Sequence, residues 1–255
     1  MDPVRIAEAA SLLAAARQSS TRIDGLPEVC RPKSAADAHA IQDAVTALLR
    51  DEVRAYKANA PVAGDPNSHG LRAPIYAANT RVSPARFPVA EAPQCGVEGE
   101  VAFRFRHDLP SRGTPYTRDE IAAAVDACAA IEVVTSRYAD PDAMSPLDKL
   151  ADCISNGGFV FGEVLSDWRA LDLAKLRVTL TVNGETVLEQ VGGHPIGDPL
   201  SVAVAFVEMM RSGGGVSAGQ FITCGSCTGL RYLNPGDTCS VRFDGLGAAE
   251  LQFVP

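Results

Sequence analysis

The chain has 255 residues, of which 46% are hydrophobic and 21% are charged, so it has ample apolar sequence for a buried core. Its formal net charge of −8 argues against a nucleic-acid-binding surface, which needs clustered Lys and Arg. No apolar run approaches the length of a membrane span, and the N-terminus lacks the pattern of a signal peptide.

Two helices are predicted at the start of the chain. Residues 4–18 carry apolar side chains at helical spacing, and Ser34 is a typical N-cap for a second, longer helix. Residues 54–58 then have the composition of a strand, which takes Lys57 into the core region. A lysine there either extends its ammonium group to solvent or serves as a catalytic cation. Residues 60–93 are rich in Pro, Gly and Asn, and we expect them to form a loop that lines an active site.

Residues 96–105 are predicted to be a strand on which function centres. Apolar residues and glycine alternate with Glu98 and Glu100, so both carboxylates lie on one face. A third carboxylate, Glu132, opens the β-rich segment 132–135. Three hard oxygen ligands on rigid strands suit Mg²⁺ or Mn²⁺, with positions left open for a substrate. The alternative is an acidic strand face exposed to solvent.

The remaining elements are short. Thr117 and Glu120 form a capping box for a helix whose apolar stripe continues to Ile131. Asn183-Gly184 is a strong hairpin signal between two alternating segments, and Asp198 caps another helix. A short helix or turn is predicted at 146–155, and further strands at 158–164, 220–224, 238–243 and 250–254.

This order does not alternate strand and helix regularly, which argues against a doubly wound sheet or a TIM barrel. We expect an α+β fold, a mixed β-roll with helices packed outside it. Residues 1–60 are predicted to be an N-terminal helical segment packed on the core, and residues 61–255 a single catalytic unit.

The cysteines and histidines give weaker signals. Seven scattered cysteines, an odd number, predict free and mostly buried thiols in a reducing cytoplasm. Cys224 and Cys227 have the spacing of a redox motif, but the residues that follow are poor helix formers, so a structural turn is favoured. His194 follows two glycines in a turn, where it either bonds a carbonyl group or takes part in chemistry.

The chain resembles the hydratase and decarboxylase branch of the fumarylacetoacetate hydrolase-like superfamily over nearly its whole length. Five segments carry the resemblance: residues 97–102, 131–137, 147–155, 193–195 and 234–237. The family fold is a mixed β-roll with an N-terminal helical part, and its members are typically homo-oligomers. The resemblance implies a metal-dependent lyase of catabolism that acts on a small 2-oxo acid.

The resemblance also implies roles for individual residues. It makes Glu98, Glu100 and Glu132 the ligands of Mg²⁺ or Mn²⁺ and Lys57 the family's lysine before the metal strand. It places the substrate beside Ser155, Asn156, Arg137 and His194. In such enzymes a 2-oxo acid chelates the metal, charge on the C2 oxygen is stabilised, and water adds at C4.

The chain departs from the family pattern at Ala78, where the hydratases carry a carboxylate, and at Asn59, where a glycine is usual. Asn156 and Lys149 are also unusual in the substrate-side loop. Asp148 or, in our assignment, Asp152 is then the expected acid or base beside Lys57. Two alternatives stay open: a decarboxylase or C–C hydrolase of a 2-oxo diacid or acylpyruvate on the same fold, and a non-catalytic paralogue with a structural or regulatory role. A further carboxylate that reaches the pocket would favour an enzyme.

Overall fold

A computed structural model describes residues 1–61 and 70–255 of the chain as an α+β fold, in agreement with the predicted class. One sheet has eight strands in the order β2-β1-β10-β5-β6-β7-β3, with β11 paired to β5. The other sheet has five, in the order β4-β13-β12-β8-β9. The strand bounds are β1 Val53–Asn59, β2 Leu71–Tyr76, β3 Thr80–Val82, β4 Ala85–Pro88, β5 Gly96–Phe105, β6 Val125–Val134, β7 Asn156–Phe161, β8 Arg177–Val182, β9 Glu185–Val191, β10 Phe221–Ser226, β11 Arg231–Tyr232, β12 Thr238–Phe243 and β13 Gly247–Val254.

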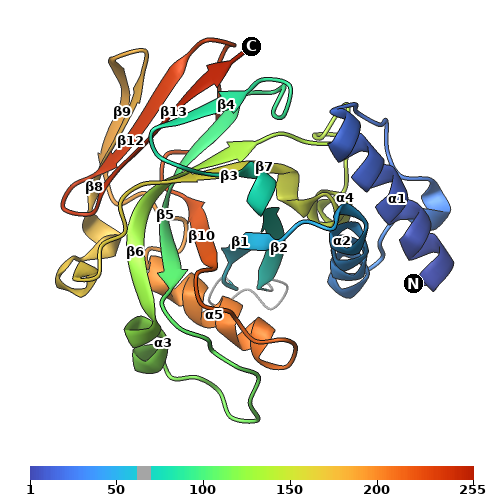
Figure 1. The fold of residues 1–255 in the computed structure, drawn as a ribbon, viewed down its shortest axis with the longest axis horizontal. Helices are drawn as coiled ribbons and strands as arrows, with labels where there is room; N and C mark the ends of the chain where they lie inside the picture. Colours follow the sequence, from blue (N-terminus) through green and yellow to red (C-terminus); the bar gives the residue numbers. More distant parts are fainter. Residues whose placement is uncertain (62–69) are drawn as a thin grey trace.

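Both sheets are mixed, because three of their strand pairs are parallel and the others are antiparallel. The parallel pairs are β1 with β10, β3 with β7, and β4 with β13. The main core lies where β5 and β6 of the large sheet pack against β12 and β13 of the small one. In Figure 1 the five-stranded sheet lies at one side of the molecule and β5 and β6 run beneath it.

In the described part of the chain, five α-helices lie around the sheets, with bounds α1 Pro3–Ser19, α2 Ala35–Leu49, α3 Arg118–Ala124, α4 Pro146–Ala151 and α5 Pro199–Arg211. Helix α5 packs on β1 and β10, and its buried Phe206 joins the main core. Helices α1 and α2 pack on each other and share a separate apolar cluster with Tyr138 and Leu150. Figure 1 shows α1, α2 and α4 together at the edge of the large sheet.

Local signals placed most elements correctly. Ser34 accepts a hydrogen bond from the backbone N–H of Asp37 and caps α2. The capping box of Thr117 and Glu120 opens α3, and Asp198 caps α5. Asn183 and Gly184 join β8 to β9 as predicted. Each of these signals depends on atoms a few residues apart, which is why the sequence alone reveals it.

Two predictions were wrong. The helix expected to continue to Ile131 ends at Ala124, and residues 125–134 form strand β6. Nearly every residue of β6 is buried, so its continuous apolar run also fits helical spacing by chance. The loop expected over residues 60–93 contains β2, β3 and β4, which pair with distant strands. Residues 62–69 of that loop lie outside the described residues.

The division of the chain at residue 60 stays a prediction. Strand β1 comes before that boundary and pairs with β2 and β10 inside the large sheet. Within the described ranges, none of the helices combines the length and the apolar character that crossing a bilayer requires.

Candidate metal centre

The three predicted carboxylates meet at one place. Antiparallel pairing of β5 with β6 sets Glu98 directly opposite Glu132, and Glu100 follows two residues later on the same face. One carboxylate oxygen from each residue lies within 4.8 Å of the others. Glu100 and Glu132 are fully buried, and the side chain of Glu98 is 15% exposed. The cluster is therefore enclosed by protein and opens only at Glu98, unlike a solvated strand face.

Close packing between the two sheets explains why a glycine, Gly99, separates the two glutamates of β5. A Cβ atom at Gly99 would come within 2.6 Å of Cγ2 of Val241 on β12. The N–H of Gly99 also donates to Oγ1 of Thr228 at 2.8 Å. The opposite face of β5 is thus pressed against the second sheet, which holds the two carboxylates in place.

A bulge in β10 supplies the hydrogen bonds to Glu100. The β5–β10 register shifts between Thr223 and Ser226, and Gly225 adopts a φ of +107° that favours glycine. The N–H of Gly225 donates to Oε2 of Glu100 at 2.7 Å, and the hydroxyl of Thr223 donates to the same oxygen. The other oxygen, Oε1, is buried and accepts no hydrogen bond from any described residue.

Glu132 is oriented by Asn156. The β6–β7 register shifts just before Val134, which lies opposite Asn156. The side-chain amide of Asn156 donates to Oε1 of Glu132 at 3.0 Å. Asn156 was predicted to lie beside the substrate, and the structure places its amide on a metal-cluster carboxylate.

Lys57 of β1 reaches the same cluster. Its Nζ lies 3.3 Å from Oε2 of Glu98 and 3.1 Å from Oε2 of Glu132. Burial lowers the pKa of Lys57, but attraction to Glu132, Glu98 and Glu100 outweighs burial and raises the pKa above its ordinary value. Lys57 is therefore a charged ammonium inside the cluster and does not extend to solvent.

One lysine does not neutralise three carboxylates. Burial, then repulsion from neighbouring glutamates, raises the pKa of Glu100 well above its ordinary value. Burial also raises the pKa of Glu132, against the opposing attraction of Lys57. Together with the unpartnered Oε1 of Glu100, these shifts indicate a site that lacks positive charge. Carboxylate oxygens at this spacing fit a hard divalent cation such as Mg²⁺ or Mn²⁺.

A cavity of about 210 Å³, which we call the lysine cavity, opens onto this cluster. Lys57 and Glu98 line it next to the cluster. The rest of its wall comes mainly from loops: Gln94, Val134, Ser136, Pro141, Asp142, Lys149, Ile154, Ser155, Leu230 and Tyr232. Its size suits a small organic acid.

The wall at Ser155 has a strained backbone. Cys153, Ile154 and Ser155 have successive φ values of 54°, 52° and 57°, in the left-handed region that residues with a Cβ atom rarely adopt. Three such residues cost on the order of 3–6 kcal/mol together. The backbone N–H of Ser155 bonds to the carbonyl of Asp152, which helps to hold the turn. Strain of this kind concentrates at functional sites, and Ser155, which was predicted to lie beside the substrate, lines the cavity.

The structure does not bring Asp152 to the cavity as an acid or base. Its buried carboxylate forms an ion pair with the guanidinium of Arg137 and accepts from Ser136 Oγ at 2.9 Å and from the backbone N–H of Arg137 at 3.0 Å. These donors, and the absence of Asp152 from the cavity wall, argue against the predicted role of Asp152 in proton transfer. Arg137 is buried and lines a different cavity, and Asp148, the other replacement considered, is buried beside Ser145.

His194 also lies outside the lysine cavity. Its Nε2 donates to the carbonyl oxygen of Cys224 at 2.7 Å, and it lies beside Gly225 behind the metal cluster. Burial, opposed by that hydrogen bond, lowers the pKa of His194. The histidine thus supports the β10 bulge that holds Glu100, and is a positioning residue.

Sequence reasoning missed the donors to Glu100, Thr223 and Gly225, and the loop residues of the cavity such as Gln94 and Asp142. Thr223 and Gly225 are more than 120 residues from Glu100 in the chain, so no local pattern connects them. The interpretation of Cys224 and Cys227 as structural holds, because both thiols are buried and burial raises the pKa of each.

Comparisons with known proteins find a matching family model and several relatives. The family model for the fumarylacetoacetate (FAA) hydrolase C-terminal domain matches residues 49–254. The chain is 29% identical to a 2-keto-4-pentenoate hydratase of Paraburkholderia phymatum, across 99% of this chain and 98% of that protein. It is 30% identical to a 4-oxalocrotonate decarboxylase of Pseudomonas putida, across 62% of this chain and 60% of that one.

Among solved structures, the fold is similar to that of the 4-oxalocrotonate decarboxylase of Pseudomonas putida G7 in complex with magnesium and adipate. The TM-score is 0.84 at 22% identity, covering 100% of this chain and 99% of the other. The same mixed β-roll with an N-terminal helical part is therefore present in both proteins.

Proposed function

This chain belongs to the fumarylacetoacetate hydrolase family, and from that premise we propose that it is a divalent-metal-dependent lyase, a hydratase of a small 2-oxo acid. The observation that carries the proposal is the buried cluster of Glu98, Glu100 and Glu132 beside Lys57, open to the lysine cavity. Similarity to a 2-keto-4-pentenoate hydratase along the whole chain supports the reaction class.

Glu98, Glu100 and Glu132 would hold Mg²⁺ or Mn²⁺. When bound, the ion supplies a Lewis acid that stabilises negative charge on the oxygens of a 2-oxo acid. Thr223 and Gly225 fix Glu100, and Asn156 fixes Glu132, so the carboxylates are oriented before any ligand arrives.

Lys57 acts as a fixed cation. Its raised pKa keeps the ammonium protonated, so it binds the carboxylate of the substrate or stabilises charge on the C2 oxygen and does not serve as a base. Its ion pairs with Glu98 and Glu132 hold Nζ at the end of the cavity where a substrate meets the cluster.

Asp142 supplies the proton-transfer group in place of the carboxylate that is missing at position 78, where this chain has Ala78. Apart from Glu98, it is the one carboxylate that lines the lysine cavity within the described ranges. We assign to its carboxylate oxygens the protonation and deprotonation of the substrate carbon chain. A further carboxylate in the pocket supports a catalytic role over the non-catalytic alternative.

Lys149 favours a second candidate function, decarboxylation of a 2-oxo diacid. It is half-buried, lines the cavity, and forms no ion pair with any residue that the structure describes. A second carboxylate on the substrate would pair with the ammonium group of Lys149. Similarity to a 4-oxalocrotonate decarboxylase supports the same reaction class, decarboxylation.

A substrate panel tests both candidates. The purified protein is assayed with 2-oxo-4-enoates, oxalocrotonate-type diacids and acylpyruvates, with Mg²⁺, with Mn²⁺ or with chelator, by following loss of enol absorbance. We expect metal-dependent turnover, with hydration and CO₂ release separating the two candidates. Absence of turnover with every compound would overturn the enzymatic proposal.

We also propose a cytoplasmic location and a homo-oligomeric state. All seven cysteines are buried and unpaired, which is typical of a reducing compartment. Sedimentation of the purified chain tests the oligomeric state, and a monomer at micromolar concentration would contradict it.

A further inference from the structure

Two large apolar side chains, Leu230 and Tyr232, line the lysine cavity and are nevertheless exposed. Their exposed fractions are 43% and 59%. Within residues 1–61 and 70–255, Tyr232 is the only exposed side chain among the Tyr, Phe and Trp residues. Exposed apolar surface is unfavourable in water, and apolar side chains that gather at a cavity mark a binding site, unlike ones scattered singly over a surface.

The register of β11 turns both side chains toward the metal cluster. In the antiparallel pair with β5, Tyr232 lies opposite Gly96. Residues opposite each other share a face of the sheet, and Gly96 is on the face that carries Glu98 two residues later. Arg231 points the other way, since its Nη2 donates to a carbonyl oxygen of β9 at 3.2 Å. Leu230 and Tyr232 therefore lie on the same face as Glu98, where the cluster opens to the cavity.

The glycine at position 96 makes room for Leu230. A Cβ atom there would lie 3.2 Å from Cδ1 of Leu230 and 2.9 Å from Cβ of Val134. Leu230 therefore packs directly over the backbone of β5, next to the end of β6. The backbone N–H of Leu233 donates to the carbonyl oxygen of Cys95 at 3.0 Å, which holds β11 in this position. The apolar surface is thus part of the fold before any ligand binds.

Three further apolar side chains from other segments continue this surface. We define the apolar wall of the lysine cavity as Val134, Pro141, Ile154, Leu230 and Tyr232. Ile154 has a φ of 52°, a conformation in which β-branched residues are rare. The strained turn of residues 153–155 therefore presents an apolar side chain to the cavity at a cost in backbone conformation.

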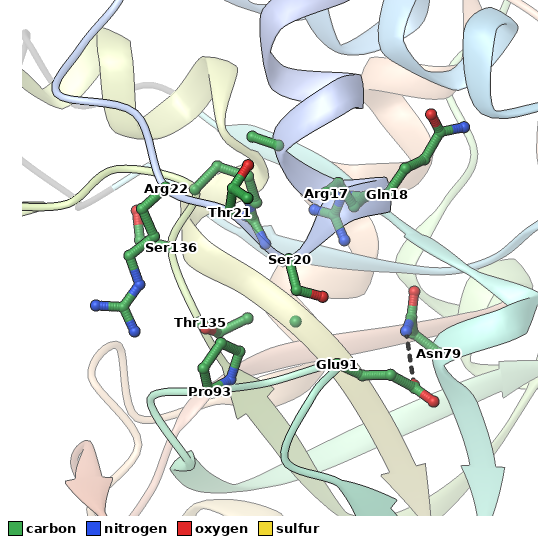
Figure 2. A pocket seen from close by; sticks show the side chains of 13 residues that line it. Arg17, Gln18, Ser20, Thr21, Arg22, Asn79, Glu91, Pro93, Thr135 and Ser136 are labelled. Carbon is green, nitrogen blue, oxygen red and sulfur yellow. Dashed lines mark hydrogen bonds between the residues drawn. The ribbon is translucent and has the colours of Figure 1, made fainter.

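The apolar wall is not a general property of cavities in this region. A second cavity, of about 140 Å³, also has Ser136 in its wall. Figure 2 shows that the side chains around it are mostly polar, among them Arg17 and Glu91. The lysine cavity differs because it combines a charged end, at Lys57 and Glu98, with an apolar side.

We propose that Leu230 and Tyr232 are specificity-determining residues that bind an apolar substituent on the carbon chain of a 2-oxo acid. This inference rests on the proposed function, and on its hydratase candidate, because the chain end of a monoacid carries no charge. The oxygens of the 2-oxo acid occupy the charged end of the cavity, and the carbon chain extends from there along the apolar wall. Binding removes apolar surface of the substituent and of both side chains from water, which favours a branched aliphatic or aromatic substituent over a bare methyl group.

Calorimetric titration of Mg²⁺-loaded protein with 2-oxo acids that cannot be hydrated tests the proposal through binding, without turnover. Pyruvate reports the charged end alone, 4-methyl-2-oxopentanoate adds a branched aliphatic substituent, and phenylpyruvate adds an aromatic one. We expect the wild type to bind one of the two larger acids at least about tenfold more tightly than pyruvate. Leu230→Ala and Tyr232→Ala should each reduce that gain several-fold and leave the affinity for pyruvate unchanged.

Two variants serve as matched controls. Tyr232→Phe keeps the apolar ring and should bind all three acids like the wild type. Leu48→Ala removes a leucine of similar exposure, 48%, from the end of α2, and should also bind like the wild type. Leu230 and Tyr232 are both exposed, so their replacement by alanine should leave the fold intact.

Pyruvate binding without a gain from either substituent would overturn the specificity inference and leave the proposed function standing. Absence of binding by all three acids would overturn both. An unchanged gain in Leu230→Ala and Tyr232→Ala would overturn the inference too, and altered sedimentation of these variants would then assign the two side chains to a contact between copies of the chain. A larger gain for phenylpyruvate than for 4-methyl-2-oxopentanoate supports an aromatic substituent, and the reverse order supports a branched aliphatic one.

Discussion

Replacing Glu100 by glutamine should stabilise the metal-free protein while it destroys the metal site. Glu100 is fully buried, and one of its oxygens has no partner in the described structure. At separations near 4.8 Å and an effective dielectric constant of about 20, each neighbouring carboxylate repels it by about 3 kcal/mol, and Lys57 offsets part of this. Glutamine keeps an acceptor for Thr223 and Gly225, and its amide can donate to a neighbouring carboxylate.

Protonation limits the destabilisation that Glu100 causes. Because the ordinary pKa is 4.5, keeping Glu100 protonated in the folded protein at pH 7.5 costs at most about 4 kcal/mol of folding free energy. We therefore expect Glu100→Gln to raise the free energy of unfolding by about 2–4 kcal/mol. Folding raises the pKa of Glu100, so the wild type is relatively most stable below the unfolded pKa and loses stability as pH rises toward the folded pKa. At pH 5 the gain should fall below about 1 kcal/mol.

Thermal unfolding of chelator-treated protein measures this effect. At pH 7.5 the midpoint of Glu100→Gln should lie roughly 5–15 °C above that of the wild type, and the gap should narrow toward pH 5. Glu185→Gln, at an exposed position, should change the midpoint little. The same Glu100→Gln protein should bind Mg²⁺ more than about 100-fold more weakly. A lower midpoint than the wild type at pH 7.5 would refute the reasoning.

Three further substitutions test the site. Lys57→Met should lower kcat/KM at least about 100-fold yet tighten Mg²⁺ binding, because a cation beside the ligands is removed; steady-state kinetics and calorimetry report both, and unchanged kcat/KM would contradict the role of Lys57. Asp152→Asn should cost about 3–5 kcal/mol in urea unfolding because Arg137 becomes an unpaired buried charge, whereas Asp172→Asn at an exposed ion pair should cost under about 1 kcal/mol; equal losses would argue against this account. Lys149→Met should raise KM for 2-oxo diacids about tenfold and leave KM for monoacids unchanged, and equal changes for both would remove Lys149 from diacid recognition.

The elements that depend on nearby residues were predictable. Alternation placed Glu98 and Glu100 on one face of a strand, and the strand spans residues 96–105 as expected. The β-rich segments around Glu132 and Lys57 made both residues candidates, the family resemblance supported them, and the structure brings both to the cluster.

Residues whose roles depend on tertiary contacts were not predictable. Asp152 and His194 occur in segments that match the family. In the structure Asp152 forms an ion pair with Arg137, and His194 donates a hydrogen bond to the carbonyl group of Cys224. Strand β6 was partly taken for helix because burial on both faces removes the period of two. Asp142 lies on a loop with no periodicity, so only the fold reveals that it reaches the lysine cavity.

The sequence by itself singled out the three carboxylates as candidates, because alternation places Glu98 and Glu100 on one strand face and Glu132 offers a third hard oxygen ligand at the start of a β-rich segment. Only the tertiary structure decided which groups hold the carboxylates, where the cluster opens to the cavity, and how its negative charge is balanced. The bulges that aim Gly225 at Glu100 and Asn156 at Glu132 arise from strand registers between segments far apart in the chain. The shortage of positive charge likewise follows from burial, since the same three glutamates in water would repel one another only weakly.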